Sequence, residues 1–172
     1  MRTLRRLSLG ALWALAALGL ACGAVWGATA AGLIQPLVVI SGSMEPEIMT
    51  GDLLVATKVD ASTLEVGDVV SLPSDLTGDL VTHRIESIES DGEGGYIISM
   101  KGDANAYSDA LDYQVSGEVW KPTLQLAGWG TALMRLSTPA VAVPLLIGLL
   151  GLLGLSLLPP QGTRRARKAA VA

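Results

Sequence analysis

The sequence predicts a mainly β fold, in which a small antiparallel β-sheet or barrel-like domain is flanked by two transmembrane helices. Two observations support this prediction. First, the 172-residue chain has no charged residue between Arg6 and Glu45 or between Arg135 and Arg164, and each gap holds a long apolar stretch. Second, the chain between these stretches forms short alternating or β-branched runs separated by Gly, Asp and Pro, which is typical of strands and turns.

The apolar stretches predict membrane spans over residues 7–33 and 140–158. Each is long enough to cross a hydrocarbon core of about 30 Å at about 1.5 Å per helical residue. The first stretch also resembles a cleavable signal peptide, because Ala28-Thr29-Ala30 offers a small-residue cleavage site. Its apolar run exceeds the roughly 7–15 residues of a signal peptide, and a second span follows, so a retained anchor is favoured.

The charged residues predict how the chain lies in a membrane. All 16 Asp and Glu lie between the two spans with five Lys and Arg, a net charge of −11, whereas the two ends carry seven Lys and Arg. Basic flanks stay on the cytoplasmic side. We therefore expect a multi-pass protein of the cell membrane, with cytoplasmic basic ends at 1–6 and 159–172 and an extracytoplasmic domain at 35–125. The acidic middle argues against binding to nucleic acid.

The extracytoplasmic segment is predicted to hold short strands separated by turns. The Gly-rich stretch Asp91–Gly95 predicts a hairpin between the last two of them. Residues 126–139 are expected to form a juxtamembrane segment. A short interfacial helix over Leu124–Leu136 is expected to lead into the second span. The predicted strands are Leu37–Ile40, Asp52–Ala56, Asp68–Leu72, Leu80–Ile88 and Tyr96–Met100.

Few residues are available for metal or redox chemistry. Cys22 is the only cysteine and lies in the first apolar stretch, so no disulfide or thiolate metal site can form within one chain. His83 is the only histidine, and no EF-hand, P-loop or dinucleotide-binding motif is present. We therefore expect neither a metal nor another cofactor.

Ser43, in Ser41-Gly42-Ser43, is a candidate nucleophile. A serine hydroxyl is weak unless a base removes its proton and nearby donors stabilise the oxyanion. Gly42 permits a tight turn, and the Ser41 hydroxyl can add a donor beside the Ser43 amide. By itself, the tripeptide fits an ordinary turn at the end of a strand better than a catalytic site.

His83 is the candidate base, because any imidazole mechanism must use it. A strand places Val81, His83 and Ile85 on one face, which points the imidazole toward the interior or a cleft. A carboxylate usually orients such an imidazole, although loop acids are commonly just solvated or cap turns. Three candidates lie after the last predicted strand: Asp103, Asp109 and Asp112.

Four segments in this order resemble the signal peptidase I family, in its endoplasmic-reticulum-type or SipW-like branch. The segments are Ser41–Pro46, Gly67–Val70, Thr82–Ile85 and Lys101–Asn105, the last followed by Asp109. The resemblance covers about residues 38–112 and the preceding anchor. Ala104 departs from the pattern, because Asn is common at that position.

The resemblance implies a β-rich serine peptidase domain. It implies that Ser43 is the acyl-forming nucleophile and that His83 is the general base, where the eubacterial branch uses a Lys. Ser41 matches the position whose hydroxyl forms the oxyanion hole together with the Ser43 amide. Asp109 is expected to complete a Ser-His-Asp triad, with Asp103 in a supporting role.

The resemblance also implies a function: a membrane-bound serine endopeptidase that cleaves N-terminal signal peptides from exported proteins after a small-x-small motif, without a cofactor. The expected partners are signal peptides of preproteins, the lipid bilayer and accessory membrane subunits. Two alternatives stay open. One is a peptidase dedicated to a narrow set of surface, matrix or pilin-like clients, and the other is a non-catalytic surface protein anchored at both ends.

Overall fold

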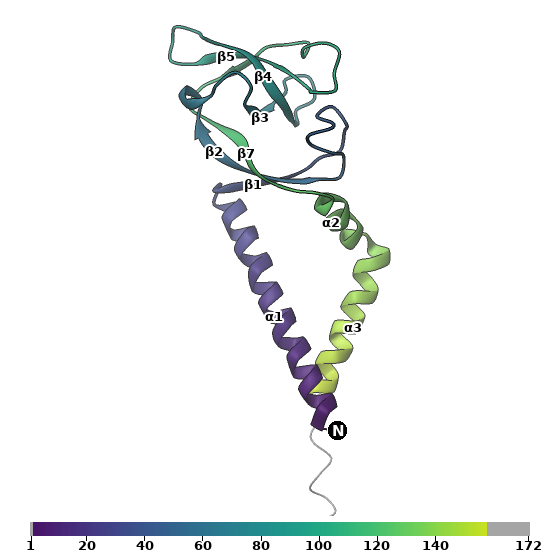
Figure 1. Ribbon diagram of the computed structural model, residues 1–172. Coiled ribbons are helices and arrows are strands. Elements are labelled where there is room, and N and C mark those ends of the chain that lie inside the picture. Colours follow the sequence, from purple (N-terminus) through teal and green to yellow (C-terminus); the bar gives the residue numbers. More distant parts are fainter. Residues whose placement is uncertain (1, 158–172) are drawn as a thin grey trace, which may run out of the picture. The chain divides into compact units, whose positions relative to one another are not determined.

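The computed structural model describes residues 2–157, which form two compact units (Figure 1). One unit, Val25–Leu136, is rich in β-structure, and the described part of the other, residues 2–24 and 137–157, is helical except at Thr138. The predicted cytoplasmic tail, 159–172, and the last residue of the second predicted span lie outside the described residues.

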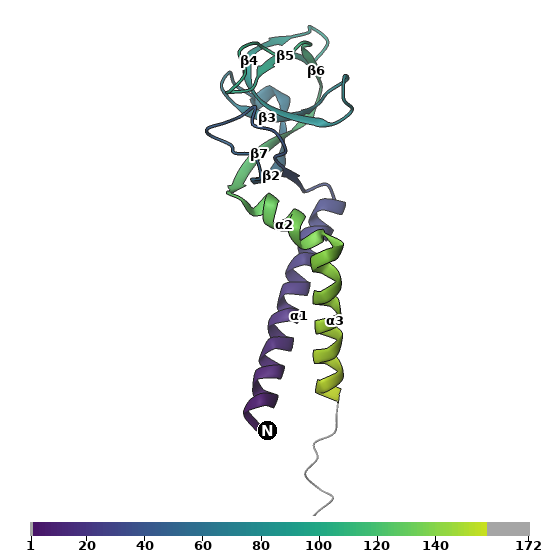
Figure 2. The same ribbon diagram turned by 90° about the vertical axis from the view of Figure 1, so that its right-hand side faces the viewer.

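The β-rich unit is built on one seven-stranded sheet with the order β1-β2-β7-β3-β4-β5-β6. Every neighbouring pair of strands is antiparallel, and Figure 2 shows that the sheet is strongly curved. The prediction of a mainly β, antiparallel fold is therefore confirmed. The elements are β1 Ile34–Val38, β2 Leu53–Asp60, the 3₁₀ turn η1 Ala61–Thr63, β3 Val69–Pro73, β4 Leu80–Ser90, β5 Tyr96–Lys101, β6 Tyr113–Val115 and β7 Glu118–Leu126.

All five predicted strands are present, with shifted ends. β1 starts at Ile34 rather than Leu37, and β4 and β5 form the predicted hairpin, in which Ser90 faces Tyr96. Asp91 holds the connection, because its Oδ1 accepts hydrogen bonds of 2.8 Å from the backbone N–H groups of both Glu93 and Gly95.

β7 was not predicted as a strand, although it lies between β2 and β3 in the sheet. Its sequence contains Pro122, which lacks a backbone N–H and normally marks an edge or a bulge. A bulge does occur here: Val55 faces Leu124 and Ala56 faces Pro122, so Thr123 is extra. The Thr123 hydroxyl donates to the Val55 carbonyl at 3.1 Å. The predicted helix over Leu124–Leu136 is wrong at its start, because β7 continues to Leu126.

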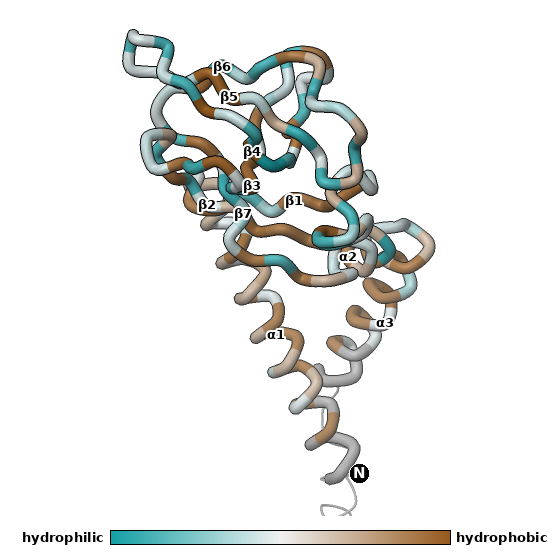
Figure 3. The backbone as a smooth tube through the Cα atoms, turned by 45° about the horizontal axis from the view of Figure 1, so that its top comes forward, coloured by the Kyte–Doolittle hydropathy of each residue, from teal (hydrophilic) through white to brown (hydrophobic). Residues whose placement is uncertain are grey.

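Two hydrophobic clusters form the core of the β-rich unit. The larger one takes its residues mainly from η1, β3, β4, β5 and β7, and includes Val70, Ile85 and Ile98. The smaller one consists of Met44, Ile48 and Leu54. Figure 3 shows hydrophobic stretches, in brown, along strands of this unit such as β3 and β5. The smaller cluster matters for the site, because Met44 is only 2 % exposed and directly follows Ser43.

The helices confirm the membrane prediction only in part. α1, Arg2–Ala30, contains a 22-residue stretch, Leu9–Ala30, that is long and apolar enough to cross a membrane. α2 is Trp129–Ser137, and α3 is Pro139–Leu157. Among the described residues, 139–151 of α3 pass the same test only together with α2, from which a break in the helix separates them. The second span is thus not confirmed as a separate membrane helix.

Candidate active site

Ser43 lies on the turn that follows β1. Burial of Met44 fixes one side of this turn, and the Ser43 carbonyl accepts a hydrogen bond of 2.8 Å from the Ala104 backbone N–H. Gly102 makes this approach possible, because a Cβ at that position would stand 2.6 Å from the Ser43 oxygen. The bond uses the backbone of residue 104, so it is formed although Ala replaces the Asn common there.

His83 lies on β4, opposite Val70 of β3, and is 8 % exposed. The predicted alternation holds, since the next residue but one, Ile85, is buried as well. The Nε2 atom of His83 lies 3.1 Å from Ser43 Oγ. The structure therefore brings together the serine and the imidazole, which are 40 residues apart in sequence.

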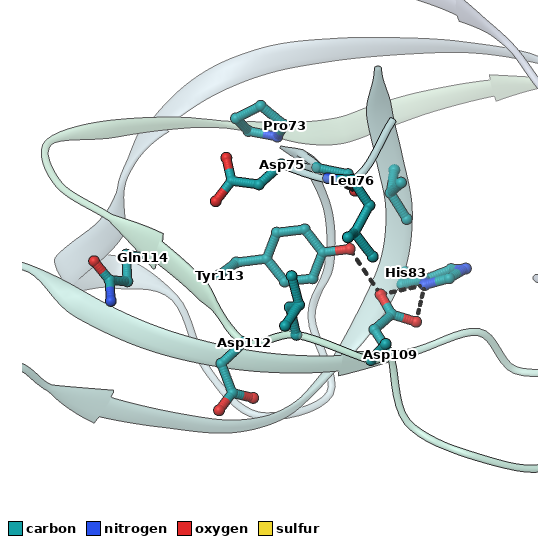
Figure 4. Close-up of a pocket in the computed structure, with 12 residues that line it drawn as sticks. Pro73, Asp75, Leu76, His83, Asp109, Asp112, Tyr113 and Gln114 are labelled. Carbon is teal, nitrogen blue, oxygen red and sulfur yellow. Dashed lines mark hydrogen bonds and ion pairs between the residues drawn. The ribbon is translucent and has the colours of Figure 1, made fainter. Parts of the chain in front are cut away.

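Asp109 is the acidic residue that faces His83. Its two carboxylate oxygens each lie 2.8 Å from His83 Nδ1 (Figure 4). The Asp109 side chain is 12 % exposed, and its backbone N–H donates to the Met100 carbonyl at 2.9 Å. With the proton on Nδ1, the imidazole donates to Asp109, which leaves Nε2 free to accept from the Ser43 hydroxyl.

Asp103 and Asp112 are placed differently. Asp103 forms a bidentate pair with Arg84 rather than a hydrogen bond with His83, with Nε–Oδ1 and Nη2–Oδ2 distances of 2.9 and 2.7 Å. Asp112 lines the same cavity as Asp109, but its carboxylate points away from His83 (Figure 4).

Arg84 is a site residue whose contacts the sequence did not reveal. It donates to Asp103, to the Gly67 carbonyl at 2.8 Å, and to Glu47 on the turn after Ser43. The hydrogen bonds with Asp103 raise the pKa of Arg84 and hold the pKa of Asp103 below its ordinary value. Arg84 stands in the segment Thr82–Ile85, but only the fold shows which acids it meets.

The Ser41 hydroxyl lies beside the candidate nucleophile, with Ser41 Oγ 3.3 Å from Ser43 Oγ. Within residues 2–157, no acceptor is found for the Ser43 backbone N–H. The Ser41 hydroxyl, one of the two donors expected at an oxyanion hole, thus lies next to the Ser43 hydroxyl.

Cavities open on both sides of His83. A groove of about 820 Å³ contains Ser43 and runs between residues 37–41 and residues 77–83. A second cavity, of about 420 Å³, lies on the Asp109 side and is lined by Leu76, Asp112 and Tyr113, among others. In the described part of the chain, no three His, Cys, Asp or Glu side chains are grouped so that they could hold a metal ion.

The groove has unpaired backbone on both sides. β1 is the first strand of the sheet, so among the described strands one of its edges has no neighbour. β4 pairs with β5 only from Arg84 onward, which leaves Leu80–His83 bonded to β3 alone. Such edges can accept an added extended strand.

Comparison with known proteins identifies relatives for part of the chain. No protein-family model matches it. It is 41 % identical to signal peptidase I W of Bacillus subtilis (strain 168) over 73 residues, which are 42 % of this chain and 37 % of that protein. It is 35 % identical over 77 residues to the signal peptidase complex catalytic subunit SEC11 of Eremothecium gossypii, which covers 45 % of this chain and 46 % of that protein.

A third relative is the signal peptidase complex catalytic subunit SEC11C of Homo sapiens, 29 % identical over 92 residues, or 54 % of this chain and 47 % of that protein. The chain thus spans less than half the length of these curated relatives. All three are named as signal peptidases or their catalytic subunits, and they confirm that this chain is similar to the signal peptidase I family.

Proposed function

We propose that the protein is a membrane-bound serine endopeptidase that removes N-terminal signal peptides from exported proteins after a small-x-small motif. One observation carries the proposal, which is the row of contacts from Ser43 through His83 to Asp109. Ser43 Oγ lies 3.1 Å from His83 Nε2, and His83 Nδ1 lies 2.8 Å from the Asp109 carboxylate, with Ser43 and His83 lining an open groove. This is the geometry of a Ser-His-Asp hydrolase. The names of the relatives suggest the substrate class.

In the first half of the reaction, Ser43 Oγ attacks the carbonyl carbon of the scissile peptide bond while its proton passes to His83 Nε2. Asp109 stabilises the imidazolium, and the Ser41 hydroxyl and Ser43 amide donate to the oxyanion. When the tetrahedral intermediate collapses, the C–N bond breaks and Nε2 returns its proton to the leaving amine. The signal peptide then stays esterified to Ser43.

In the second half, a water molecule gives a proton to Nε2 and attacks the ester carbonyl. Breakdown of this second intermediate releases the signal peptide carboxylate, and Ser43 regains its proton from Nε2. Every proton moves through one imidazole, and the residues at the site suffice without a cofactor.

The groove suits an extended peptide. Its sides offer unpaired backbone at β1 and at residues 80–83, so a bound segment can add as a strand while its alternate side chains enter the groove. The walls near Ser43 include Val39 and Leu54. These apolar walls fit the small uncharged side chains of a small-x-small site better than charged ones.

The apolar helix α1 supports membrane attachment, and the signal peptides of preproteins arrive in the same bilayer. We propose that the protein is multi-pass, with both termini cytoplasmic and the β-rich unit outside, as the positive-inside rule favours. The relatives named as catalytic subunits of a complex suggest accessory membrane subunits as further partners.

The test compares the detergent-purified full chain with Ser43→Ala at matched folding, using a preprotein that carries a small-x-small site. We expect the wild type to cleave after that site and the variant to lose activity by about 10³-fold or more, since the nucleophile is removed. Cleavage at equal rates by both proteins would refute a serine mechanism. The site of cleavage is read by mass spectrometry of the mature product.

A further inference from the structure

Tyr113, at the start of β6, contacts the acidic residue of the site from the side opposite His83. Its hydroxyl donates a hydrogen bond of 2.9 Å to Asp109 Oδ2, the oxygen that also lies 2.8 Å from His83 Nδ1. Figure 4 shows the phenol directed at the carboxylate. The ring packs against the larger hydrophobic cluster, and Tyr113 faces Ile98 of β5 in the sheet. The hydroxyl is therefore held by a strand and not by a loop.

The phenol is suited to be a constant donor. Burial and the hydrogen bond to Asp109 raise the pKa of Tyr113 well above its ordinary value, while a hydrogen bond with Ser74 acts in the opposite direction. The hydroxyl thus stays protonated wherever a histidine base works. Asp109 needs such a fixed contact, because it lies on the loop between β5 and β6 and can otherwise rotate about its side-chain bonds.

We propose that Tyr113 is a positioning residue that holds the Asp109 carboxylate in register with His83, and thereby keeps the imidazole proton on Nδ1. The effect expected on turnover rests on the proposed function. The structural part of the inference concerns only the hydrogen bonds that join Tyr113, Asp109 and His83. The phenol itself touches neither Ser43 nor the groove that contains it, so it acts on the reaction only through Asp109.

The decisive variant is Tyr113→Phe, which keeps the packed ring and removes only the hydroxyl. Tyr96→Phe is the matched control, because Tyr96 packs against the same cluster, and within residues 2–157 its hydroxyl has no hydrogen-bond partner. We expect kcat for preprotein cleavage to fall about tenfold in Tyr113→Phe with KM unchanged, since a hydrogen bond to a charged group is lost. Tyr96→Phe should keep the wild-type kcat.

Two further readouts separate positioning from a general structural role. In an Asp109→Asn background, Tyr113→Phe should cause no further loss, because the residue through which it acts has already been changed. The second readout is ¹⁵N NMR of histidine-labelled protein, which gives one imidazole because His83 is the only histidine. We expect the Nδ1–H tautomer in the wild type and in Tyr96→Phe, and a larger share of Nε2–H in Tyr113→Phe.

A kcat for Tyr113→Phe equal to that of Tyr96→Phe would overturn the inference. An equal further loss in the Asp109→Asn background, or an unchanged His83 tautomer, would also overturn it. Failure of the proposed function is recognised separately, because wild type and Ser43→Ala would then cleave alike or not at all. The NMR comparison would still test the Tyr113–Asp109–His83 contact in that case.

Discussion

Neighbouring residues on β4 serve different parts of the site. His83 contacts Ser43 and Asp109, whereas Arg84 pairs with Asp103 and Glu47. Because successive strand residues point to opposite faces, one strand can present an imidazole to the groove and a guanidinium to the loops that carry Asp103 and Glu47. Asp103 and Asp109 thus have distinct surroundings, although both lie on the loop between β5 and β6.

This difference predicts unequal effects of removing each carboxylate. Asp109→Asn should lower kcat by about 10³–10⁴-fold, because an amide can stabilise neither the imidazolium nor the Nδ1–H tautomer. Asp103→Asn should change kcat by less than about tenfold, since it weakens only a partly exposed ion pair. Initial rates of preprotein cleavage decide the matter. Near-normal turnover by Asp109→Asn with loss of turnover by Asp103→Asn would reverse the assignment of the two acids.

Single residues also mark the limit of sequence reasoning at the site. Ser41, Ser43 and His83 could be chosen because each stands in a recognisable short segment, and Asp109 because it follows one; the structure brings these four together. Their catalytic roles stay a prediction. Tyr113 could not be chosen, because a tyrosine four residues after an aspartate carries no signal until β6 turns its ring toward that aspartate.

At the scale of elements, Asp52 joins the start of β2 to the segment before α2. Its side chain is buried, and it accepts hydrogen bonds from Gly128 N–H at 2.8 Å, Gln125 Nε2 at 2.7 Å and Met49 N–H at 3.1 Å. The bonds from Gly128 and Gln125 hold the pKa of Asp52 below its ordinary value, although burial acts in the opposite direction. The charged form is therefore the one that the fold requires.

This pKa direction predicts a pH-dependent contribution to stability. A carboxyl whose pKa is lower in the folded state stabilises the fold above its unfolded pKa of about 3.9, and that contribution is lost as the pH falls through the folded pKa. Asp52→Asn should thus cost about 1–3 kcal/mol near pH 7. The deficit should shrink as the pH falls below about 4.

The measurement is thermal unfolding of wild type and variant across that pH range. Asp79→Asn is the control, since Asp79 is exposed and should show no such dependence. A deficit of Asp52→Asn that stayed constant down to the lowest pH would contradict the proposed role of the charge.

Local patterns predicted the elements with strong periodicity and missed those shaped by tertiary contacts. β2 to β5 alternate or are β-branched, so their positions were predictable within a few residues. β7 contains Pro122, and its place in the sheet depends on a bulge that accommodates Thr123 against β2. Strand propensity cannot anticipate such pairing, because it reflects the neighbours as much as the residue itself.

At the scale of the whole molecule, charge separation predicts the topology. With Cys22 replaced by Ser, a single cysteine placed by Glu93→Cys on the hairpin should react with a membrane-impermeant maleimide in intact cells. A cysteine placed by Ala169→Cys in the basic tail should react only after permeabilisation. Labelling is read by a gel shift. Reaction of both positions in intact cells would contradict cytoplasmic termini, and protection of position 93 would contradict an external β-rich unit.

The place of β7 in the sheet has a consequence for when Ser43 and His83 can first come together during synthesis. Ser43 follows β1 and belongs with β2, while His83 and Asp109 belong with β3 to β6, and in the sheet order only β7 joins these two halves. β7 is also the last strand to leave the ribosome. A nascent chain therefore lacks the strand that joins the halves carrying Ser43 and His83 until residue 126 has emerged. Under the proposed function, an unfinished sheet instead of a propeptide would keep the nascent chain inactive.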